Sequence, residues 1–435
     1  MAAPRGIIIA APSSGSGKTI ITLALLRALR NRGIAVGSAK AGPDYIDPGF
    51  HAAASGRSAV NLDIWAMRLP VLDRAASAIS GEIVICEGAM GLFDGAGRGG
   101  NLGSTADLAA HTGWPVVLVV DAARQSASVA ALVRGFATHR SDVTLAGVIL
   151  NKIGSARHAG MLRQALGETL PGVAVLGAIP RDPALTLPER HLGLVLAEEH
   201  LDLDRFLDAA ATVVARSVDL AALQTLATPV KRDAGAGVSP RAPGRRIAVA
   251  RDRAFAFVYP HLLDNWRAAG AEILPFSPLG DAAPAEDADF IFLPGGYPEL
   301  HATRLAAARQ FRDGMTRAAA RGVAIYAECG GYMVLGERLI DAGGTAHKML
   351  GLLPVATSLA APRRHLGYRV VEGLDGPWQG QRLRGHEFHY ASLTGSGAAL
   401  PLWSMRDADG DSLGEVGHVV GSVSGSFFHM IDPTG

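Results

Sequence analysis

One of the two cysteines, Cys329, stands in the stretch YAECGGYMVLG (326–336), directly before two glycines. The apolar run VAIYA before it predicts a buried strand, and small residues after a nucleophile let the chain turn sharply and present the side chain. A thiolate attacks acyl carbons once a base has taken its proton, and nearby backbone N–H groups stabilise the oxyanion. We therefore predict a nucleophilic Cys329 with Gly330 in its oxyanion hole; an inert core thiol is the alternative.

A base must accompany this thiol. The C-terminal half offers several histidines, and His429 in GSFFHM follows strand-like sequence and precedes DPTG, a predicted turn. We predict that His429 assists the proton transfers. The stretch LPGGYPEL (293–300) places a second pair of glycines at a strand end, where Gly296 is expected to complete the oxyanion hole.

The stretch APSSGSGKT (11–19) is typical of a phosphate-binding loop, because it lies between an apolar strand and a helix-length segment. Backbone N–H groups at Ser14, Gly15 and Gly17 can approach phosphate oxygens, and the helix N-terminus favours negative charge. Lys18 is predicted to reach the β and γ phosphates, and the Thr19 hydroxyl suits Mg²⁺. Pro12 stands where the usual pattern has its first glycine, so an ordinary Gly/Ser-rich turn is the alternative.

Two acidic segments follow predicted strands. KAGPDYIDPGFH carries Asp44 and Asp47, and CEGAMGLFDG carries Glu87 and Asp94. The carboxyl ends of strands in a doubly wound sheet face the ligand crevice, so these loops are expected to meet near the phosphates. Mg²⁺ takes oxygen ligands and usually one or two carboxylates, which predicts a site made of Thr19, Asp44 and Glu87. The alternative is that such acids cap helices or close turns.

The other side chains of these loops are predicted to contact the substrate. Asp47 and Asp94 lie further along and are expected to face the group that is phosphorylated, while Tyr45 and Ile46 pack against it. Asn151, at another strand end in GVILNKIGS, has an amide that can read an adenine edge or close a turn, and the sequence does not decide between the two.

The chain as a whole predicts an α/β protein of two doubly wound domains. Its 435 residues exceed one compact core. Short β-branched runs apolar on consecutive residues alternate with helix-length segments, as in parallel sheets. The Gly-, Pro- and Arg-rich stretch from 227 to 245 interrupts this rhythm, which restarts at 246. We therefore predict a synthetase domain over 1–226, a linker over 227–245 and a second domain over 246–435.

Charge and cysteine usage exclude several partners. Lys plus Arg number 41 against 40 Asp plus Glu, so no net field recruits nucleic acid or anionic lipid. Two cysteines give no disulfide framework, and no apolar stretch reaches spanning length. These features predict a cytoplasmic protein with neither nucleic acid nor membrane as partner. The sequence leaves open whether the protein forms a homodimer.

These motifs together carry a resemblance. LPGG, AECGGYMVLG and GSFFH resemble the class I glutamine amidotransferase domain in its cobalamin-biosynthesis branch. SSGSGKT, KAGPDYIDPGFH and ICEGAMGLFDG look like the dethiobiotin synthetase-related ATP-binding domain. Joined in this order, the halves resemble the cobyrinic or hydrogenobyrinic acid a,c-diamide synthases over nearly the whole chain. GPDYIDPGFH and PERHLGL (188–194) favour this family over its relative cobyric acid synthase.

The resemblance implies a reaction. Cys329 would release ammonia from L-glutamine, and ATP with Mg²⁺ would activate the a and c side-chain carboxylates of a corrin ring as acyl phosphates for amidation. The general class I pattern has an acid two positions after the histidine, where this chain has Ile431. Amidation of another tetrapyrrole such as nickel-sirohydrochlorin is the nearest alternative, and a phosphate-loop switch ATPase a more distant one. The sequence does not show whether the corrin contains cobalt.

Overall fold

The computed structural model describes residues 4–186, 196–200, 202–231 and 241–434. The chain divides into two compact units, one of Met1–Trp65 with Leu69–Gly237 and one of Ala66–Arg68 with Val238–Gly435. The stretch PERHLGL and residues 232–240 of the predicted linker lie outside the described residues.

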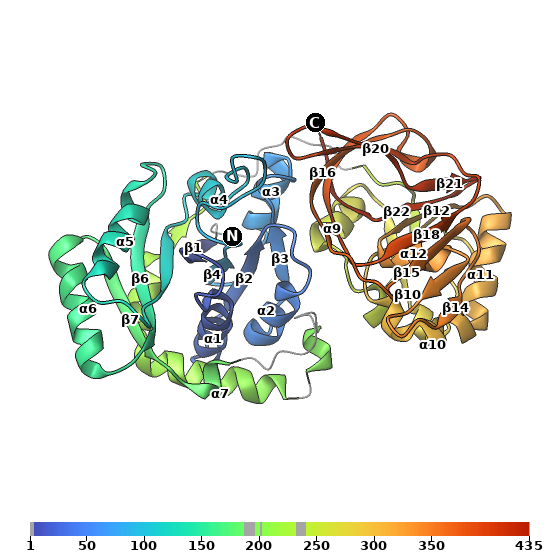
Figure 1. Ribbon diagram of the computed structural model, residues 1–435. Coiled ribbons are helices and arrows are strands. Elements are labelled where there is room, and N and C mark those ends of the chain that lie inside the picture. Colours follow the sequence, from blue (N-terminus) through green and yellow to red (C-terminus); the bar gives the residue numbers. More distant parts are fainter. Residues whose placement is uncertain (1–3, 187–195, 201, 232–240, 435) are drawn as a thin grey trace. The chain divides into compact units, whose positions relative to one another are not determined.

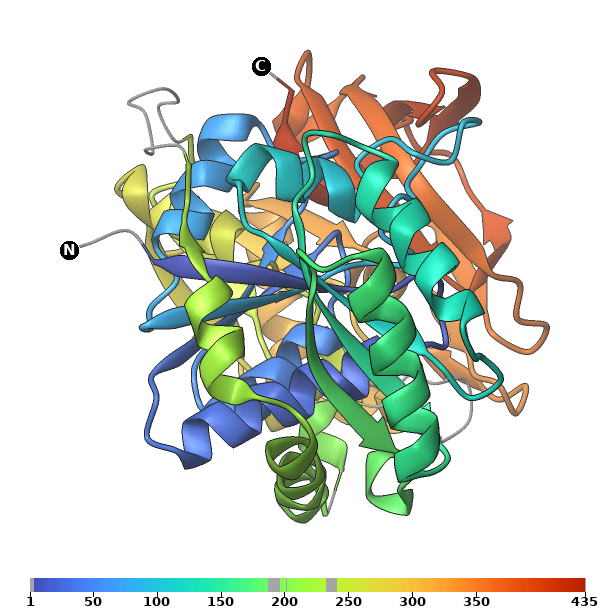
Figure 2. The same ribbon diagram turned by 90° about the vertical axis from the view of Figure 1, so that its left-hand side faces the viewer.

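The first unit is built on a parallel sheet in the order β3-β2-β4-β1-β5-β6-β7. Helices flank this sheet in Figures 1 and 2. The strands are β1 Arg5–Ala10, β2 Val36–Ala41, β3 Ala59–Leu62, β4 Ile83–Glu87, β5 Val116–Asp121, β6 Leu145–Ile153, β7 Ala174–Pro180 and β8 Thr228–Pro229. The helices are α1 Lys18–Asn31, α2 Asp47–Ser55, α3 Leu69–Ser77, α4 Thr105–Thr112, α5 Ser128–Thr138, α6 Ala156–Thr169, α7 Leu203–Ser217 and α8 Leu220–Leu226.

Most of these strands coincide with the predicted apolar runs, but two do not. The run at β3 is only four residues long and gave no signal. β8 lies inside the predicted linker and pairs antiparallel with β1, so ordered structure of the first unit continues past residue 226. In this pairing Thr228 lies opposite Gly6. The absence of a side chain at Gly6 also leaves room for the ring of Trp114.

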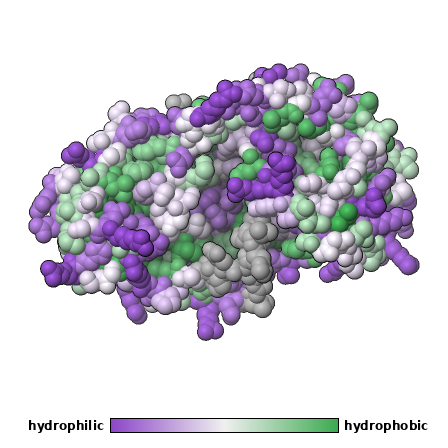
Figure 3. Space-filling model, in the orientation of Figure 1, coloured by the Kyte–Doolittle hydropathy of each residue, from purple (hydrophilic) through white to green (hydrophobic). Residues whose placement is uncertain are grey.

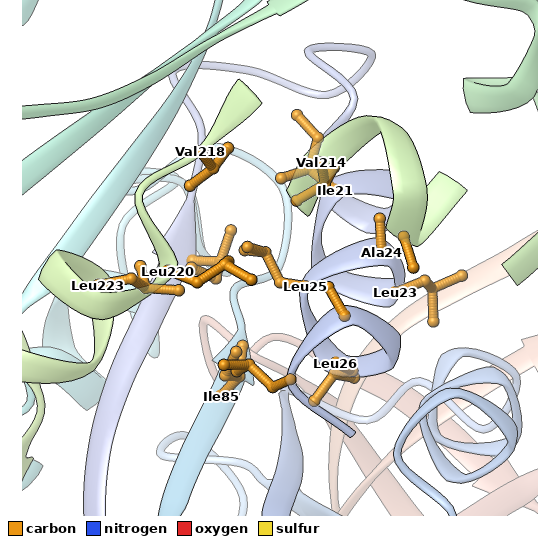
Figure 4. Packing of buried hydrophobic residues seen from close by; sticks show 14 of the residues in the cluster. Ile21, Leu23, Ala24, Leu25, Leu26, Ile85, Val214, Val218, Leu220 and Leu223 are labelled. Atoms are coloured by element: carbon orange, nitrogen blue, oxygen red, sulfur yellow. The ribbon is translucent and has the colours of Figure 1, made fainter. Parts of the chain in front are cut away.

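Helix α1 holds the phosphate loop against the core. Its residues Ile21 to Leu29 are all buried, because the helix lies between the sheet and α7. Figure 4 shows Leu25 and Leu26 close to Ile85 of β4, with Val214 of α7 and Leu220 of α8 on neighbouring sides. A helix so fixed presents Lys18 and Thr19 of its first turn at a defined place beside the sheet.

The second unit contains a six-stranded sheet, β10-β9-β11-β12-β22-β21, parallel except for β21. Its strands are β9 Arg246–Ala250, β10 Glu272–Phe276, β11 Phe290–Leu293, β12 Ala324–Glu328, β21 His418–Val420 and β22 Val423–Ser426. The helices are α9 Pro260–Ala268, α10 Ala302–Ala307, α11 Arg309–Ala320 and α12 Gly330–Leu335. This part confirms the predicted α/β class.

Two further sheets of the second unit were not predicted. One has the order β14-β13-β15-β18 and the other is antiparallel, β20-β19-β16-β17-β23. Their strands are β13 Arg338–Ile340, β14 Ala346–Lys348, β15 Val355–Ser358, β16 His365–Gly373, β17 Arg382–His389, β18 Ser392–Ser396, β19 Trp403–Asp407, β20 Ser412–Val416 and β23 Phe428–Pro433. Several are partly exposed and lack continuous apolar runs, so their sequence does not stand out.

On the face seen in Figure 3, hydrophilic side chains are spread among hydrophobic ones. Among the described residues, none of the helices combines the length and the apolar character that crossing a membrane requires.

Candidate active sites

Cys329 lies on a strained turn between a strand and a helix. β12 ends at Glu328, α12 begins at Gly330, and the backbone of Cys329 itself has φ +45°. This left-handed conformation is unfavourable for a side chain other than glycine and persists only when the surroundings enforce it. Here the Cys329 N–H donates to the Ser426 carbonyl at 2.8 Å and the Gly331 N–H to Pro294 at 3.1 Å. The thiol is thus held at the carboxyl end of the sheet.

His429 reaches the same place from β23. Gly295 lies next to both side chains, because a Cβ built on it would be 2.4 Å from His429 Cε1 and 3.3 Å from Cys329 Cβ. The ladder of β17 and β23 places His386 opposite His429, and their rings stack with centroids 4.9 Å apart. The structure therefore brings together the two residues that were predicted to act on glutamine.

We expect Gly295→Ala to disrupt this pairing. Its φ is not in the left-handed region, so alanine fits the backbone, but the new methyl group collides with the ring of His429. A displacement of about 1 Å at reacting groups lowers rates on the order of 10²-fold. Glutamine hydrolysis should fall by about that factor, measured as glutamate release. Gly395→Ala is the matched control, because its Cβ would meet only Ala356 Cβ at 3.7 Å.

The two glycines predicted for the oxyanion hole are neighbours. A Cβ on Gly330 would be 3.0 Å from the backbone nitrogen of Gly296. Gly296 has φ +158°, and a Cβ there would lie 2.2 Å from the Ala254 carbonyl oxygen, so only glycine fits. Two backbone N–H groups next to the thiol are the arrangement that a tetrahedral oxyanion requires.

The surroundings of Cys329 and His429 shift the pKa of both side chains. Burial and the carboxylate of Glu299 raise the pKa of Cys329, and the Gly330 N–H opposes them weakly. Burial and the neighbouring rings of His386 and His389 hold the pKa of His429 well below its usual range. These shifts favour the neutral forms of both groups, a protonated thiol and an unprotonated imidazole.

His429→Ala should therefore slow glutamine hydrolysis by a factor on the order of 10²–10⁴, the usual contribution of a general acid/base. The comparison is made with His347→Ala, a histidine of the same unit that pairs with Asp341 instead. Full activity of His429→Ala, with loss on replacing His386, would reassign the base.

The phosphate loop has the expected backbone. Gly15 and Gly17 adopt φ +82° and +91°, and Gly17 directly precedes α1. Lys18 donates to the Gly88 carbonyl at the end of β4, and the loop after β4 is fixed to the phosphate loop through Leu92 N–H and Ala11 O at 2.9 Å. Ser14 is exposed on the loop. These contacts assemble the predicted nucleotide residues at the carboxyl ends of β1 and β4.

Glu87 is the centre of a buried polar cluster. Its carboxylate is fully buried and accepts from Thr19 Oγ1 at 2.5 Å and Lys40 Nζ at 3.0 Å, with His51 Nε2 at 2.7 Å and Lys18 Nζ at 3.7 Å. Lys40 also pairs with Asp47 at 2.5 Å. Four donors around one carboxylate explain how a charge survives without water.

The ionisation of this cluster follows from its pairing. Burial opposes the charge on Glu87, but Lys40 and His51 outweigh it and hold the pKa of Glu87 well below its usual range. Burial likewise opposes the charge on Lys40, but Glu87 and Asp47 raise its pKa above the ordinary value. Burial and the charge of Lys40 lower the pKa of Lys18. Glu87 and Lys40 therefore keep opposite charges beside the phosphate loop.

The remaining predicted residues fall into different surroundings. Asp44 is exposed and accepts from the N–H groups of Ile46 and Asp47 at 2.7 and 2.9 Å, which closes the turn before α2. Asp94 is exposed and accepts from Gly91 N–H at 2.9 Å. Ile46 packs against the core of the first unit, and Tyr45 is partly buried. Asp44 thus has the turn-closing role that the sequence analysis named as the alternative.

Asn151 supports the phosphate loop. Its amide nitrogen donates to the Ser16 carbonyl at 2.9 Å, and its oxygen accepts from Lys152 N–H at 2.8 Å. Both polar ends of the side chain therefore serve the local backbone, which favours the turn-closing interpretation over reading of adenine.

Sequence reasoning missed Lys40, His51 and Gly295. Lys40 had a signal, because a lysine within a buried strand needs a partner. His51 and Gly295 had none beyond their motifs, since their contacts arise from the packing of separate elements. In the described part of the chain, no group of three or more His, Cys, Asp or Glu side chains is arranged to hold a metal ion.

Residues 246–433 match the CobB/CobQ-like glutamine amidotransferase domain, and residues 7–195 match the CobQ/CobB/MinD/ParA nucleotide binding domain. A hydrogenobyrinate a,c-diamide synthase of Brucella abortus is 58% identical over 99% of this chain and 99% of its own. The chain belongs to the hydrogenobyrinate a,c-diamide synthase family. Enzymes of that name from Rhizobium meliloti and Rhodobacter capsulatus are 55% and 53% identical, each over 98% of this chain and 99% of its own.

Membership of this diamide synthase family assigns the chemistry of both units. The chain is an amido-transferring ligase of cobalamin biosynthesis, with glutamine as its nitrogen source and ATP bound by its nucleotide-binding domain. The switch-ATPase alternative is thereby set aside, because a switch ATPase does not require a glutamine amidotransferase domain.

Proposed function

We propose that the chain amidates the a and c side-chain carboxylates of hydrogenobyrinate, a corrin without cobalt. The name shared by relatives more than half identical over their full length supports this substrate over cobyrinate and nickel-sirohydrochlorin. Residues 1–226 act as the synthetase domain and residues 246–435 as the glutaminase. Cytoplasmic location and a homodimer stay predictions.

The observation that carries the proposal is that Cys329 and His429 both lie next to Gly295. His429 takes the thiol proton, and Cys329 attacks the side-chain amide of glutamine. Gly296 and Gly330 stabilise the oxyanion, ammonia leaves, and water hydrolyses the thioester to glutamate.

In the first unit, Lys18 and the backbone around Gly15 and Gly17 hold the phosphates of ATP. Thr19 Oγ1 and Glu87 Oε1 form an oxygen pair beside the loop, which fits Mg²⁺. Asp44 would be the further carboxylate ligand of this ion, and Mg²⁺ would neutralise charge on the phosphates when bound. The corrin carboxylate becomes an acyl phosphate that ammonia captures.

Asp47, Asp94, Tyr45 and Ile46 face this carboxylate. Lys40 holds Asp47 in place and brings a further positive charge to the phosphate end of the site. Asn151 acts on the nucleotide through the loop backbone that it supports.

Mass spectrometry tests the substrate. With ATP, Mg²⁺ and glutamine, hydrogenobyrinate should gain two amides, whereas cobyrinate and nickel-sirohydrochlorin should react much more slowly. Preferred amidation of either competitor would overturn the substrate assignment while leaving the glutaminase assignment intact.

A further inference from the structure

Glu328 is a buried acid directly beside the thiol that the steps above do not use. It is the last residue of β12, and only 1% of its surface is exposed. Its Oε1 accepts from Met430 N–H at 3.0 Å, and its Oε2 lies 3.8 Å from His429 Nδ1. One carboxyl group thus reaches two successive residues of β23, while its own chain continues into Cys329.

The place where class I glutaminases carry an acid is apolar in this chain. Ile431, two residues after His429, is 1% exposed, and its carbonyl accepts from His261 at 2.9 Å. Glu328 reaches the Nδ1 side of the His429 ring from a different strand. Burying a carboxyl group costs free energy, and this cost can be offset when the carboxylate compensates the positive charge of a neighbouring protonated base.

We propose that Glu328 is the positioning residue of the glutaminase site, holding the ring of His429 and compensating the imidazolium that forms when His429 takes the proton of Cys329. This proposal rests on the proposed glutaminase function. The S–H bond breaks, its proton moves to His429, and sulfur bonds to the amide carbon of glutamine. The imidazolium then gives the proton to the departing ammonia, and Glu328 forms no covalent bond.

The groups around this pair support the assignment. Tyr326 lies on the same strand as Glu328, and His386 stacks on His429 from β17. Burial, weakly opposed by Met430 N–H and Tyr326, raises the pKa of Glu328 to about 8. Glu328 Oε2 lies 3.8 Å from His429 Nδ1, and a carboxylate and an imidazolium stabilise each other when both form. Glu328 is therefore an acid placed to respond to the charge on His429.

The test is Glu328→Gln, which keeps the size of the side chain and an acceptor for Met430 N–H but removes the acid. We expect kcat for glutamine hydrolysis to fall on the order of 10²-fold or more, with little change in KM. Alkylation of Cys329 by a diazoketone analogue of glutamine should slow by a similar factor. Glu372→Gln, an exposed acid of β16, is the matched control.

A merely structural role would lower thermal stability without changing kcat of the folded enzyme. If Glu328→Gln does not fold, Glu328→Asp and Glu328→Asn are compared, since they differ only in the acid at equal size. The proposal would be overturned if kcat were equal in the wild type and Glu328→Gln, or equal in Glu328→Asp and Glu328→Asn. Ammonia-dependent synthesis should be unchanged in the three Glu328 variants and in the control Glu372→Gln. If Cys329→Ala retained glutamine-dependent synthesis, the glutaminase function itself would be wrong, which is a separate outcome.

Discussion

Cys329→Ala is expected to abolish glutamine-dependent amidation while synthesis from ammonium salts continues. The thiol is the nucleophile that opens glutamine, but the nucleotide residues lie in the other unit and need only free ammonia. Alanine has nearly the size of cysteine and tolerates the φ of +45° equally poorly, so the turn should change little. Both reactions are measured on one preparation by mass spectrometry of the corrin product.

The other cysteine provides the control for this variant. Cys86 lies fully buried in β4, and burial raises its pKa to about 12, so it stays an inert thiol. Cys86→Ala should retain glutamine-dependent amidation. Failure of Cys329→Ala with abundant ammonia, although folded, would contradict the division of labour between the units.

Glu87→Gln is expected to have the opposite phenotype: loss of synthesis from either nitrogen source, with glutamine hydrolysis retained. The substitution removes the charge that Thr19, Lys18 and Lys40 surround, so ATP-dependent turnover should fall on the order of 10²-fold or more. It also leaves Lys40 with Asp47 as its main partner, which should lower the free energy of unfolding by about 1–3 kcal/mol.

Urea unfolding and ammonia-dependent product formation measure these two effects separately. Glu82→Gln is the control, because Glu82 is exposed one residue before the same strand and a glutamine can still accept from Ala35 N–H. Normal synthesis by folded Glu87→Gln would remove Glu87 from the nucleotide site.

The sequence predicted those parts of the molecule whose signals are local. Continuous apolar runs identified the strand that carries Glu87 and the strand that ends directly before Cys329, and glycine spacing identified the phosphate loop. A strand buried on both faces must be apolar throughout, so its sequence is distinctive. The antiparallel sheet that contains His429 has strands such as His365–Gly373 that are partly exposed, and their mixed sequence does not reveal pairing.

The contacts within each site depend on packing and register. His386 stands opposite His429 because of a register shift between Arg384 and Gly385, and a slip of one residue would turn the ring to the other face. Likewise Asp44 and Glu87 look equivalent in sequence, but Asp44 closes an exposed turn, whereas Glu87 is fully buried among four donors. Such differences arise only when separate elements meet.

The order of the elements along the chain has a consequence for synthesis on the ribosome. Cys329 emerges well before His429, with all strands from β13 to β22 between them, while the phosphate loop and Glu87 emerge first. Because domains generally fold in order of synthesis, the unit that consumes ammonia can form before the glutaminase has both its thiol and its base. A growing or prematurely terminated chain that lacks β23 therefore carries the nucleophile without the residue that activates it. Nascent chains are therefore expected to hydrolyse glutamine efficiently only after β23 has been made.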